Sequence, residues 1–242
     1  MNSKNGPTTL SQSELSKFEL MAEDWWNPSG KFKPLHDITP LRLEYIINLS
    51  KLHFKVDSLN SIKTLDVGCG GGLVTEGLSR LGTKITGIDA SAININIAKN
   101  HAKLANLNIN YQQILAEDLL KTKEKFQLII ALEILEHVDN IELFIETCCK
   151  LLAPNGLLIF STINKTFSAL LQTIIGAEYI LKWLPVGTHD YSKFVKPSLI
   201  NKISSNQGMH VINIQGLSYN LLSNSWSLTN NIDNNYFISF TG

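Results

Sequence analysis

The 242-residue chain has few cysteines, no excess of charge of either sign and no long uninterrupted apolar run. Its three cysteines, Cys69, Cys148 and Cys149, are too few for a disulfide framework, and none stands in a Cys-x-x-Cys metal pattern. Lys and Arg together number 21, as do Asp and Glu, so a net charge of zero gives no electrostatic argument for nucleic acid. We therefore expect a protein of a reducing compartment that does not bind nucleic acid.

Targeting and membrane-spanning segments are also missing from the sequence. Residues 1–16 are polar and lack the apolar centre of a signal peptide, and no arginine precedes Arg42, which argues against an organellar transit peptide. No run of about 18 uncharged apolar residues is present to cross a membrane. These absences predict a cytoplasmic protein, and the length fits one good-sized α/β domain.

Strand-like and helix-like segments alternate through the middle of the chain. Strands are predicted at 62–67, 84–89, 109–114, 126–132 and 157–162, and helices at 72–81, 91–105 and 141–152. This alternation is typical of right-handed β-α-β units in a parallel, doubly wound sheet. After a helix at 196–206, strands at 211–217 and 235–240 have no helix between them, which predicts an antiparallel C-terminal pair and a seven-stranded, mostly parallel sheet. Residues 219–234 are expected to form a loop.

The first strand runs into a glycine-rich turn, Gly68-Cys69-Gly70-Gly71-Gly72, preceded by Asp66. Glycine lets the backbone turn sharply and approach a ligand, and the following helix begins with unpaired N–H groups. Asp89 ends the next strand, 89 − 68 = 21 residues after Gly68, where an acidic side chain can bind both hydroxyls of a ribose. The dinucleotide-binding motif Gly-x-Gly-x-x-Gly would need a glycine at residue 73, where this chain has leucine. The turn instead has the pattern Gly-x-Gly-x-Gly. It resembles the first motif of class I S-adenosylmethionine-dependent methyltransferases, and a plain turn in another α/β protein is the alternative.

Several further candidates follow the carboxyl ends of strands, which share one edge of a parallel sheet. We expect this edge to bind the cofactor through Asp66, Gly68, Gly70, Gly72, Asp89, Glu117 and Leu132. Arg42 stands in the first turn of a predicted helix, where a cation is locally unfavourable. It is a candidate for the methionine carboxylate of the cofactor, with a surface salt bridge as the alternative.

Two segments lie outside this alternating pattern. Residues 1–52 are predicted as an N-terminal arm, with 1–12 disordered, a helix from about 13, an extended stretch at 31–40 and a helix at 41–52. The arm either covers the ligand site or packs on the main domain, 53–242. Residues 164–190 are strongly apolar but contain Glu178 and Lys182, so a transmembrane helix is not expected. An inserted core helix, a hydrophobic lid over the site and a helix at a membrane surface remain as alternatives.

Glu133, Glu136 and His137 directly follow the strand at 126–132 with helical spacing i, i+3, i+4. If a helix begins there, the three side chains share one face. Such a group can hold Mg²⁺ or another divalent cation, or supply a general base. An acidic helix start with a locally satisfied histidine is the third alternative, and the residues alone do not choose among the three.

Longer segments resemble a particular family. They are Trp25-Trp26, Phe32 to His36, Pro40 to Leu43, Leu65 to Gly72, Glu133 to Val138, Gly176 to Leu181 and Gly187 to Asp190. In these segments the chain resembles the ubiquinone-biosynthesis O-methyltransferases, which methylate polyprenylated catechols and hydroquinols. The resemblance implies a Rossmann-like class I methyltransferase fold. It also implies S-adenosylmethionine contacts at Arg42, Gly68, Asp89 and Leu132 and a divalent ion at Glu133, Glu136 and His137.

The resemblance further implies a polyprenyl catechol or demethylubiquinol as substrate, and other quinone-biosynthesis proteins as partners. A substrate so apolar suggests that residues 164–185 touch a membrane surface, at the inner face of the inner membrane. A phenol titrates at about 10, so a metal at Glu133 or a base such as His137 or His189 is needed to remove its proton. The alternatives are another small-molecule or lipid methyltransferase, and a non-catalytic scaffold that binds S-adenosylmethionine.

Overall fold

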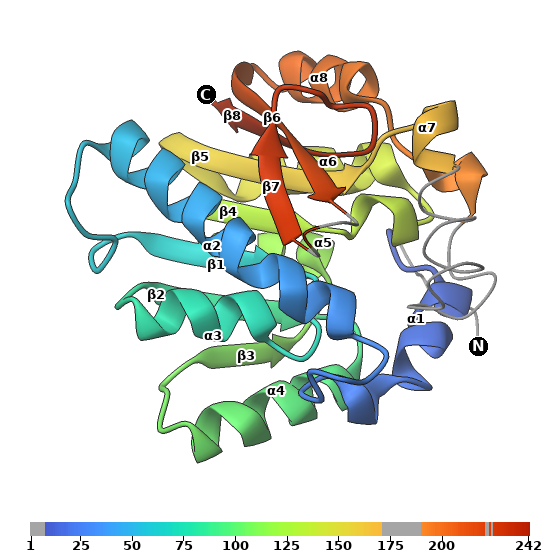
Figure 1. Cartoon of the computed structure of the whole chain (residues 1–242). Helices are drawn as coiled ribbons and strands as arrows, with labels where there is room; N and C mark the ends of the chain where they lie inside the picture. Colours follow the sequence, from blue (N-terminus) through green and yellow to red (C-terminus); the bar gives the residue numbers. More distant parts are fainter. Residues whose placement is uncertain (1–7, 171–189, 221–222, 224) are drawn as a thin grey trace, which may run out of the picture.

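An eight-stranded mixed sheet forms the centre of the computed structural model, which describes residues 8–170, 190–220, 223 and 225–242 (Figure 1). Its order is β3-β2-β1-β4-β5-β8-β6-β7. The strands are β1 (Lys63–Val67), β2 (Lys84–Asp89), β3 (Asn110–Gln113), β4 (Phe126–Leu132), β5 (Leu152–Ile163), β6 (His210–Asn220), β7 (Ser225–Thr229) and β8 (Asn235–Thr241). Strands β1 to β5 are parallel, whereas β8 runs antiparallel to both β5 and β6. The predicted doubly wound sheet with an antiparallel C-terminal pair is confirmed, but the sheet has eight strands and not the predicted seven, because β7 adds to β6.

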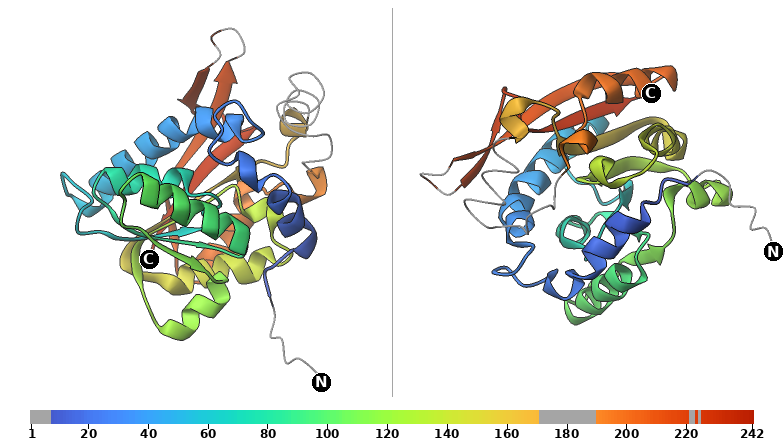
Figure 2. Two further views of the ribbon diagram at one scale, coloured as in Figure 1. Left: turned by 90° about the horizontal axis from the view of Figure 1, so that it is seen from below. Right: turned by 90° about the vertical axis from the view of Figure 1, so that its right-hand side faces the viewer.

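Helices cover both faces of this sheet (Figures 1 and 2). They are α1 (Gln12–Glu19), α2 (Lys33–Phe54), α3 (Leu73–Arg80), α4 (Ala92–Leu104), α5 (Ala116–Leu119), α6 (Ile141–Leu151), α7 (Phe167–Leu170) and α8 (Pro197–Asn206). Short 3₁₀ segments are η1 (Ala22–Asp24), η2 (Leu120–Thr122), η3 (Leu135–His137) and η5 (Tyr191–Lys193). Helices α2 and α3 pack on one face, and α5, α6 and α8 on the other.

The central strands are buried on both faces. In β4, Leu128, Ile129, Ile130 and Ala131 have no exposed surface, and alternate residues contact the two different cores. A continuous apolar run of this kind is what a parallel strand between two helical layers requires. Burial from both sides therefore fixes β1, β4 and β5 at the centre, with their carboxyl ends at one edge.

Helix α2 corrects the predicted extended stretch at 31–40, because the helix already begins at Lys33 and contains Pro40. Proline is well tolerated near the start of a helix, where Pro34 stands, but an internal proline such as Pro40 removes a backbone donor and crowds the carbonyl of the preceding turn. Ile38 and Ile46 face the core and are almost fully buried. Burial of this face stabilises the helix across Pro40.

Two other differences lie at the ends of the chain. Residues 219–234 were expected to be loop, but β7 pairs there with β6, with Tyr219 opposite Trp226. Residues 8–12 were expected to be disordered, yet Thr9 is buried. Of the predicted apolar insertion at 164–190, the structure describes residues 164–170, which include α7, and residue 190, while 171–189 lie outside the described residues. Among the described helices none is long and apolar enough to cross a membrane.

Candidate functional site

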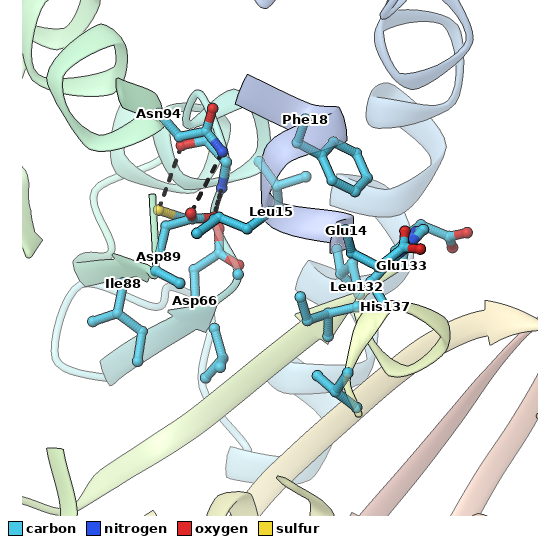
Figure 3. A pocket seen from close by; sticks show the side chains of 18 of the residues that line it. Glu14, Leu15, Phe18, Asp66, Ile88, Asp89, Asn94, Leu132, Glu133 and His137 are labelled. Carbon is cyan, nitrogen blue, oxygen red and sulfur yellow. Dashed lines mark hydrogen bonds and ion pairs between the residues drawn. The ribbon is translucent and has the colours of Figure 1, made fainter. Parts of the chain in front are cut away.

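A pocket of about 250 Å³ lies at the carboxyl ends of β1, β2 and β4 and is bordered by helix α1 (Figure 3). Strand β1 has β2 on one side and β4 on the other, so the strand order reverses here, as at the ligand site of open α/β sheets. The predicted residues that line the pocket are Arg42, Asp66, Gly68, Gly70, Asp89, Leu132, Glu133, Glu136 and His137. Gly72 and Glu117 are outside the lining, and His189 is outside the described residues.

The glycine turn after β1 lies directly against Trp25, a residue that the sequence did not assign to the site. A Cβ atom built on Gly70 would lie 2.5 Å from the Trp25 ring, and one built on Gly71 would lie 2.7 Å from Trp25 Cβ. The buried indole donates from Nε1 to Asn94 Oδ1 at 2.9 Å and stacks on Phe32, with ring centroids 3.9 Å apart. The missing side chains at Gly70 and Gly71 therefore let Trp25 close one wall of the pocket.

Asp89 ties the end of β2 to this turn. Its Oδ2 accepts from the Gly70 N–H at 3.0 Å, and its Oδ1 accepts from the Ser91 N–H at 2.8 Å. Burial raises the pKa of the Asp89 carboxyl above its ordinary value, while these hydrogen bonds oppose the shift. Oδ1 also accepts from Asn94 Nδ2 at 3.4 Å, so of the roughly four lone-pair sites of the carboxylate one, on Oδ2, remains for a ribose hydroxyl. The geometry fits the predicted role for one of the two hydroxyls.

Asp66 lies beneath the turn and is almost fully buried. Its Oδ2 accepts from Thr75 Oγ1 at 2.5 Å, which joins the end of β1 to the first turns of α3. Desolvation raises the pKa of Asp66 to about 7. Asp66 therefore borders the pocket, and its hydrogen bond with Thr75 also holds the glycine turn in place.

The buried Arg42 and the partly exposed Glu133 form an ion pair in the pocket, with 3.0 Å between Nη2 and Oε1. Glu133 also accepts from Ser161 Oγ at 2.6 Å, and its backbone has φ +50°, a left-handed conformation that is unusual for glutamate. Arg42 is 4% exposed, and its Nε has no hydrogen-bond partner among the described residues. A buried unsatisfied N–H is costly, and a ligand carboxylate would satisfy it. Arg42 thus fits a methionine carboxylate.

Glu136 and His137 do not share a helix face with Glu133, and that part of the prediction is wrong. The left-handed residue Glu133 turns the chain away from β4, and only the 3₁₀ segment η3 follows. Glu136 is buried and accepts from Thr162 Oγ1 at 2.8 Å, and burial, followed by the charge of Glu133, raises its pKa to about 7. His137 Nδ1 lies 2.9 Å from Glu14 Oε2.

The expected metal site is therefore unsupported. Glu133, Glu136 and His137 each bind a different partner, namely Arg42, Thr162 and Glu14. Across the described part of the chain, no three His, Cys, Asp or Glu side chains are placed to hold a metal ion. The donor set as arranged does not fit a divalent cation.

The N-terminal segment supplies contacts that sequence patterns did not indicate. Glu117 accepts from the Thr9 N–H at 2.8 Å, so its carboxylate faces this segment. Glu19 accepts from Ser91 Oγ at 2.8 Å, and Glu14 binds His137. These partners are about 70 to 120 residues apart in the chain, so no local periodicity could connect them.

Comparisons with known proteins agree with this geometry. A family model described as "Methyltransferase domain" matches residues 42–211. Relatives from Pelagibacter ubique and Bartonella tribocorum, both named "Ubiquinone biosynthesis O-methyltransferase", are 46% and 45% identical over 236 residues. The matches cover 96% of this chain and 98% and 96% of the two relatives.

Solved structures show the same fold. Magnesium protoporphyrin IX methyltransferase from Synechocystis with bound S-adenosylmethionine has a TM-score of 0.62 at 14% identity, covering 97% of this chain and 99% of its own. The N-methyltransferase NodS from Bradyrhizobium japonicum, in complex with S-adenosyl-l-homocysteine, has a TM-score of 0.60 at 18% identity, covering 94% and 97%. At these identities the likeness concerns the fold.

Proposed function

Since the chain belongs to the ubiquinone biosynthesis O-methyltransferases, we propose that its pocket seats S-adenosylmethionine beside a polyprenylated catechol or hydroquinol and directs methylation of one phenolic oxygen. The protein is an S-adenosylmethionine-dependent O-methyltransferase of ubiquinone biosynthesis. What the proposal adds is the residue roles and the substrate class. The observation that carries it is the convergence of Gly70, Asp89 and the Arg42–Glu133 pair on one pocket.

Asp89 and Arg42 are proposed to fix the two ends of the methyl donor. Asp89 accepts from a ribose hydroxyl, while Gly68 and Gly70 let the backbone approach the ligand. Arg42 binds the methionine carboxylate through the guanidinium that now pairs with Glu133. Leu132 provides an apolar surface between these two polar ends. Held at both ends, the sulfonium methyl has a defined position in the pocket.

Methyl transfer is an in-line displacement, so alignment of the phenolic oxygen, the methyl carbon and the sulfur is the main requirement. The oxygen bonds to the methyl carbon as the carbon–sulfur bond breaks, and that electron pair stays on sulfur. His137 is the proposed acceptor of the phenolic proton, because it lines the pocket and is 12% exposed. No step requires a metal ion. If Mg²⁺ added after chelation raised activity, the contacts of Glu133, Glu136 and His137 would have to rearrange on binding.

The test combines calorimetry with a transfer assay. We expect S-adenosylmethionine to bind and a short-chain prenylated catechol to be O-methylated, with the product identified by mass spectrometry. Binding without transfer would favour the non-catalytic scaffold. Transfer only to other acceptors would favour another small-molecule or lipid methyltransferase. Absence of binding would refute the proposal.

The association with membranes and the division of the chain are also part of the proposal. Residues 1–52 form the arm over the site and 53–242 the methyltransferase domain, with 164–190 as its insertion. The apolar sequence of 164–185 and the 69% exposed side chain of Phe167 in α7 support peripheral contact with the inner face of the membrane. Co-sedimentation with lipid vesicles should decrease when Phe167 is replaced by serine. If sedimentation with the vesicles were unchanged, Phe167 would have no role in membrane contact. The expected protein partners are other proteins of quinone biosynthesis.

A further inference from the structure

The segment between α1 and α2 contacts α4 and reaches the glycine turn with a second tryptophan, Trp26 (Figures 1 and 2). Its indole Nε1 donates to the Gly71 carbonyl at 2.9 Å, across 45 residues of sequence. The indole also stacks on His101 of α4, with ring centroids 3.4 Å apart and planes at 5°. Trp26 therefore bridges the N-terminal arm, α4 and the turn that is proposed to seat the cofactor.

The peptide group between Gly71 and Gly72 is held on both sides. Its carbonyl accepts from Trp26, and its N–H, on Gly72, donates to the Cys69 carbonyl at 2.9 Å. Gly70 and Gly72 have positive φ angles of +53° and +91°, and glycine reaches many other backbone conformations at little cost. Hydrogen bonds of this kind therefore select one conformation of the turn, and one of them comes from the arm.

The Trp26 ring is oriented from its other side by His101 and Glu76. His101 Nδ1 lies 2.8 Å from Glu76 Oε1, and Glu76 is 1% exposed although it is charged. The second oxygen of this carboxylate pairs with Arg80 at 3.3 Å. A buried polar network whose members all have partners is rigid, so it fixes the imidazole plane, on which the indole lies flat.

We propose that Trp26 is a positioning residue for S-adenosylmethionine binding, which holds the 71–72 peptide of the glycine turn in the conformation that receives the cofactor. The His101–Glu76 pair is the platform that orients its ring. The inference rests on the proposed function, in which this turn seats the cofactor. Gly70 and Leu73, on either side of the held peptide, line the pocket, whereas Trp26 does not. Trp26 therefore acts through the turn and not by contact with the ligand.

This contact implies a reciprocal coupling between the arm and the cofactor. A seated arm orders the turn before the ligand arrives, so less conformational freedom is lost on binding. By thermodynamic linkage, a bound cofactor must favour the seated arm by the same factor. We therefore expect the arm to be better protected in the complex than in the free protein.

The alternative is that Trp26 only fixes the arm to the domain and contributes equally to the free and the bound protein. Its loss would then lower Tm but leave the affinity for the cofactor unchanged. Other contacts also hold the arm, because Trp25 donates to Asn94 at 2.9 Å and stacks on Phe32. Loss of the Trp26 N–H alone should therefore leave the arm seated, so the affinity separates the two roles.

The experiment compares Trp26→Phe with Trp226→Phe, the same substitution in β7 at the edge of the sheet. Phenylalanine keeps a ring for the stack on His101 but has no N–H. Trp226 Nε1 has no hydrogen-bond partner among the described residues, so the control breaks no such bond. We expect Trp26→Phe to raise the Kd of S-adenosylhomocysteine roughly 3- to 10-fold by calorimetry, and Trp226→Phe to leave it within about twofold of wild type. An unchanged Kd in Trp26→Phe, or an equal rise in both variants, would overturn the inference.

Hydrogen exchange followed by mass spectrometry tests the coupling directly. In the wild type, bound S-adenosylhomocysteine should slow exchange of the backbone amides of residues 20–32. At saturating ligand this slowing should be smaller in Trp26→Phe. Exchange of this segment that the ligand does not alter in the wild type would refute the coupling.

A double-mutant cycle tests the platform. His101→Ala should raise the Kd of S-adenosylhomocysteine in the wild-type background but add nothing in Trp26→Phe, because its effect passes through the indole N–H. Additive rises would exclude the platform. If the wild type binds S-adenosylhomocysteine and methylates the catechol, failure of these tests leaves the proposed function intact. Absence of binding by the wild type would refute both.

Discussion

Glu133 connects the end of β4 to the arginine proposed to bind the cofactor, and Glu133→Gln tests that connection. In the wild type, Oε1 of Glu133 lies 3.0 Å from Arg42 Nη2 and accepts from Ser161 Oγ at 2.6 Å. Glutamine keeps the length of the side chain and one acceptor oxygen but has no charge. The substitution therefore leaves a guanidinium that is 4% exposed without its counter-charge.

The expected loss in the free energy of unfolding of Glu133→Gln follows from the burial of the ion pair. Removing one partner of a fully buried ion pair costs about 3–5 kcal/mol in the free energy of unfolding. Because the Glu133 side chain is 18% exposed and glutamine keeps one acceptor oxygen, we expect the low end, about 3 kcal/mol. For a chain of 242 residues, 1 kcal/mol corresponds to about 2–4 °C in Tm, so we expect the ligand-free Tm to fall by about 6–12 °C. S-adenosylhomocysteine carries the same carboxylate as the methyl donor. If Arg42 binds that carboxylate, the ligand replaces the lost charge and should raise the Tm of the variant more than that of the wild type at the same saturating concentration.

Thermal melting followed by circular dichroism, with and without S-adenosylhomocysteine, measures both effects. Glu142→Gln in the first turn of α6, where Glu142 is exposed, is the matched control and should melt as wild type does. Methylation by Glu133→Gln should fall more than cofactor binding, because the cofactor carboxylate can replace the lost counter-charge, whereas an Arg42 without its Glu133 contact no longer aligns the sulfonium methyl for transfer. An unchanged ligand-free Tm would refute the energetic role of the pair. A smaller ligand-induced shift than in wild type would show that the carboxylate does not bind Arg42.

Three further substitutions test other parts of the site. Gly71→Ala places a methyl group against Trp25, so it should lower the free energy of unfolding by about 1–3 kcal/mol. It should also shift the tryptophan fluorescence emission, and an unchanged spectrum would refute this packing. Asp89→Asn weakens acceptance from the ribose and should lower cofactor affinity roughly 10- to 100-fold by calorimetry, whereas wild-type affinity would exclude the contact. Asp66→Asn tests the raised pKa. Because the folded-state pKa of about 7 lies above the ordinary 3.8, ionisation of Asp66 destabilises the fold as pH rises through this interval. The variant should therefore gain in Tm relative to wild type between about pH 4 and 7, and a constant difference would contradict the shift.

The parts of the fold that follow from local patterns were predictable from the sequence. Strand β4 is a continuous apolar run, and the predicted bounds 126–132 agree with Phe126–Leu132. The glycine turn and Asp89 each follow a strand, and parallel strands place such residues at one edge. Their contact, from the Gly70 N–H to Asp89, therefore follows from topology and needs no detailed knowledge of packing.

The parts that were missed depend on contacts between distant segments or on a single backbone angle. Strand β7 is polar by sequence and exists because it pairs with β6. Helix α2 continues through Pro40 because its buried face packs on the sheet. The helical spacing of Glu133, Glu136 and His137 suggested a shared face, but the positive φ of Glu133 separates them. No periodicity in the sequence reports that angle.

The left-handed conformation of Glu133 also explains how the cofactor part and the proton-accepting part of the pocket are joined. A non-glycine residue in this region costs of order 1–3 kcal/mol and persists only where surrounding contacts hold it. Here the Glu133 N–H donates to the Ser161 carbonyl at 2.9 Å, Ser161 Oγ binds the carboxylate, and Arg42 pairs with the same oxygen. The turn directs the Glu133 carboxylate toward Arg42 and sends the chain on to His137, where helix α1 meets it. Glu133 therefore supplies both the backbone turn and the carboxylate that pairs with Arg42. A glycine at position 133 would relieve the backbone strain but would remove the contact with Arg42 and so disrupt the site.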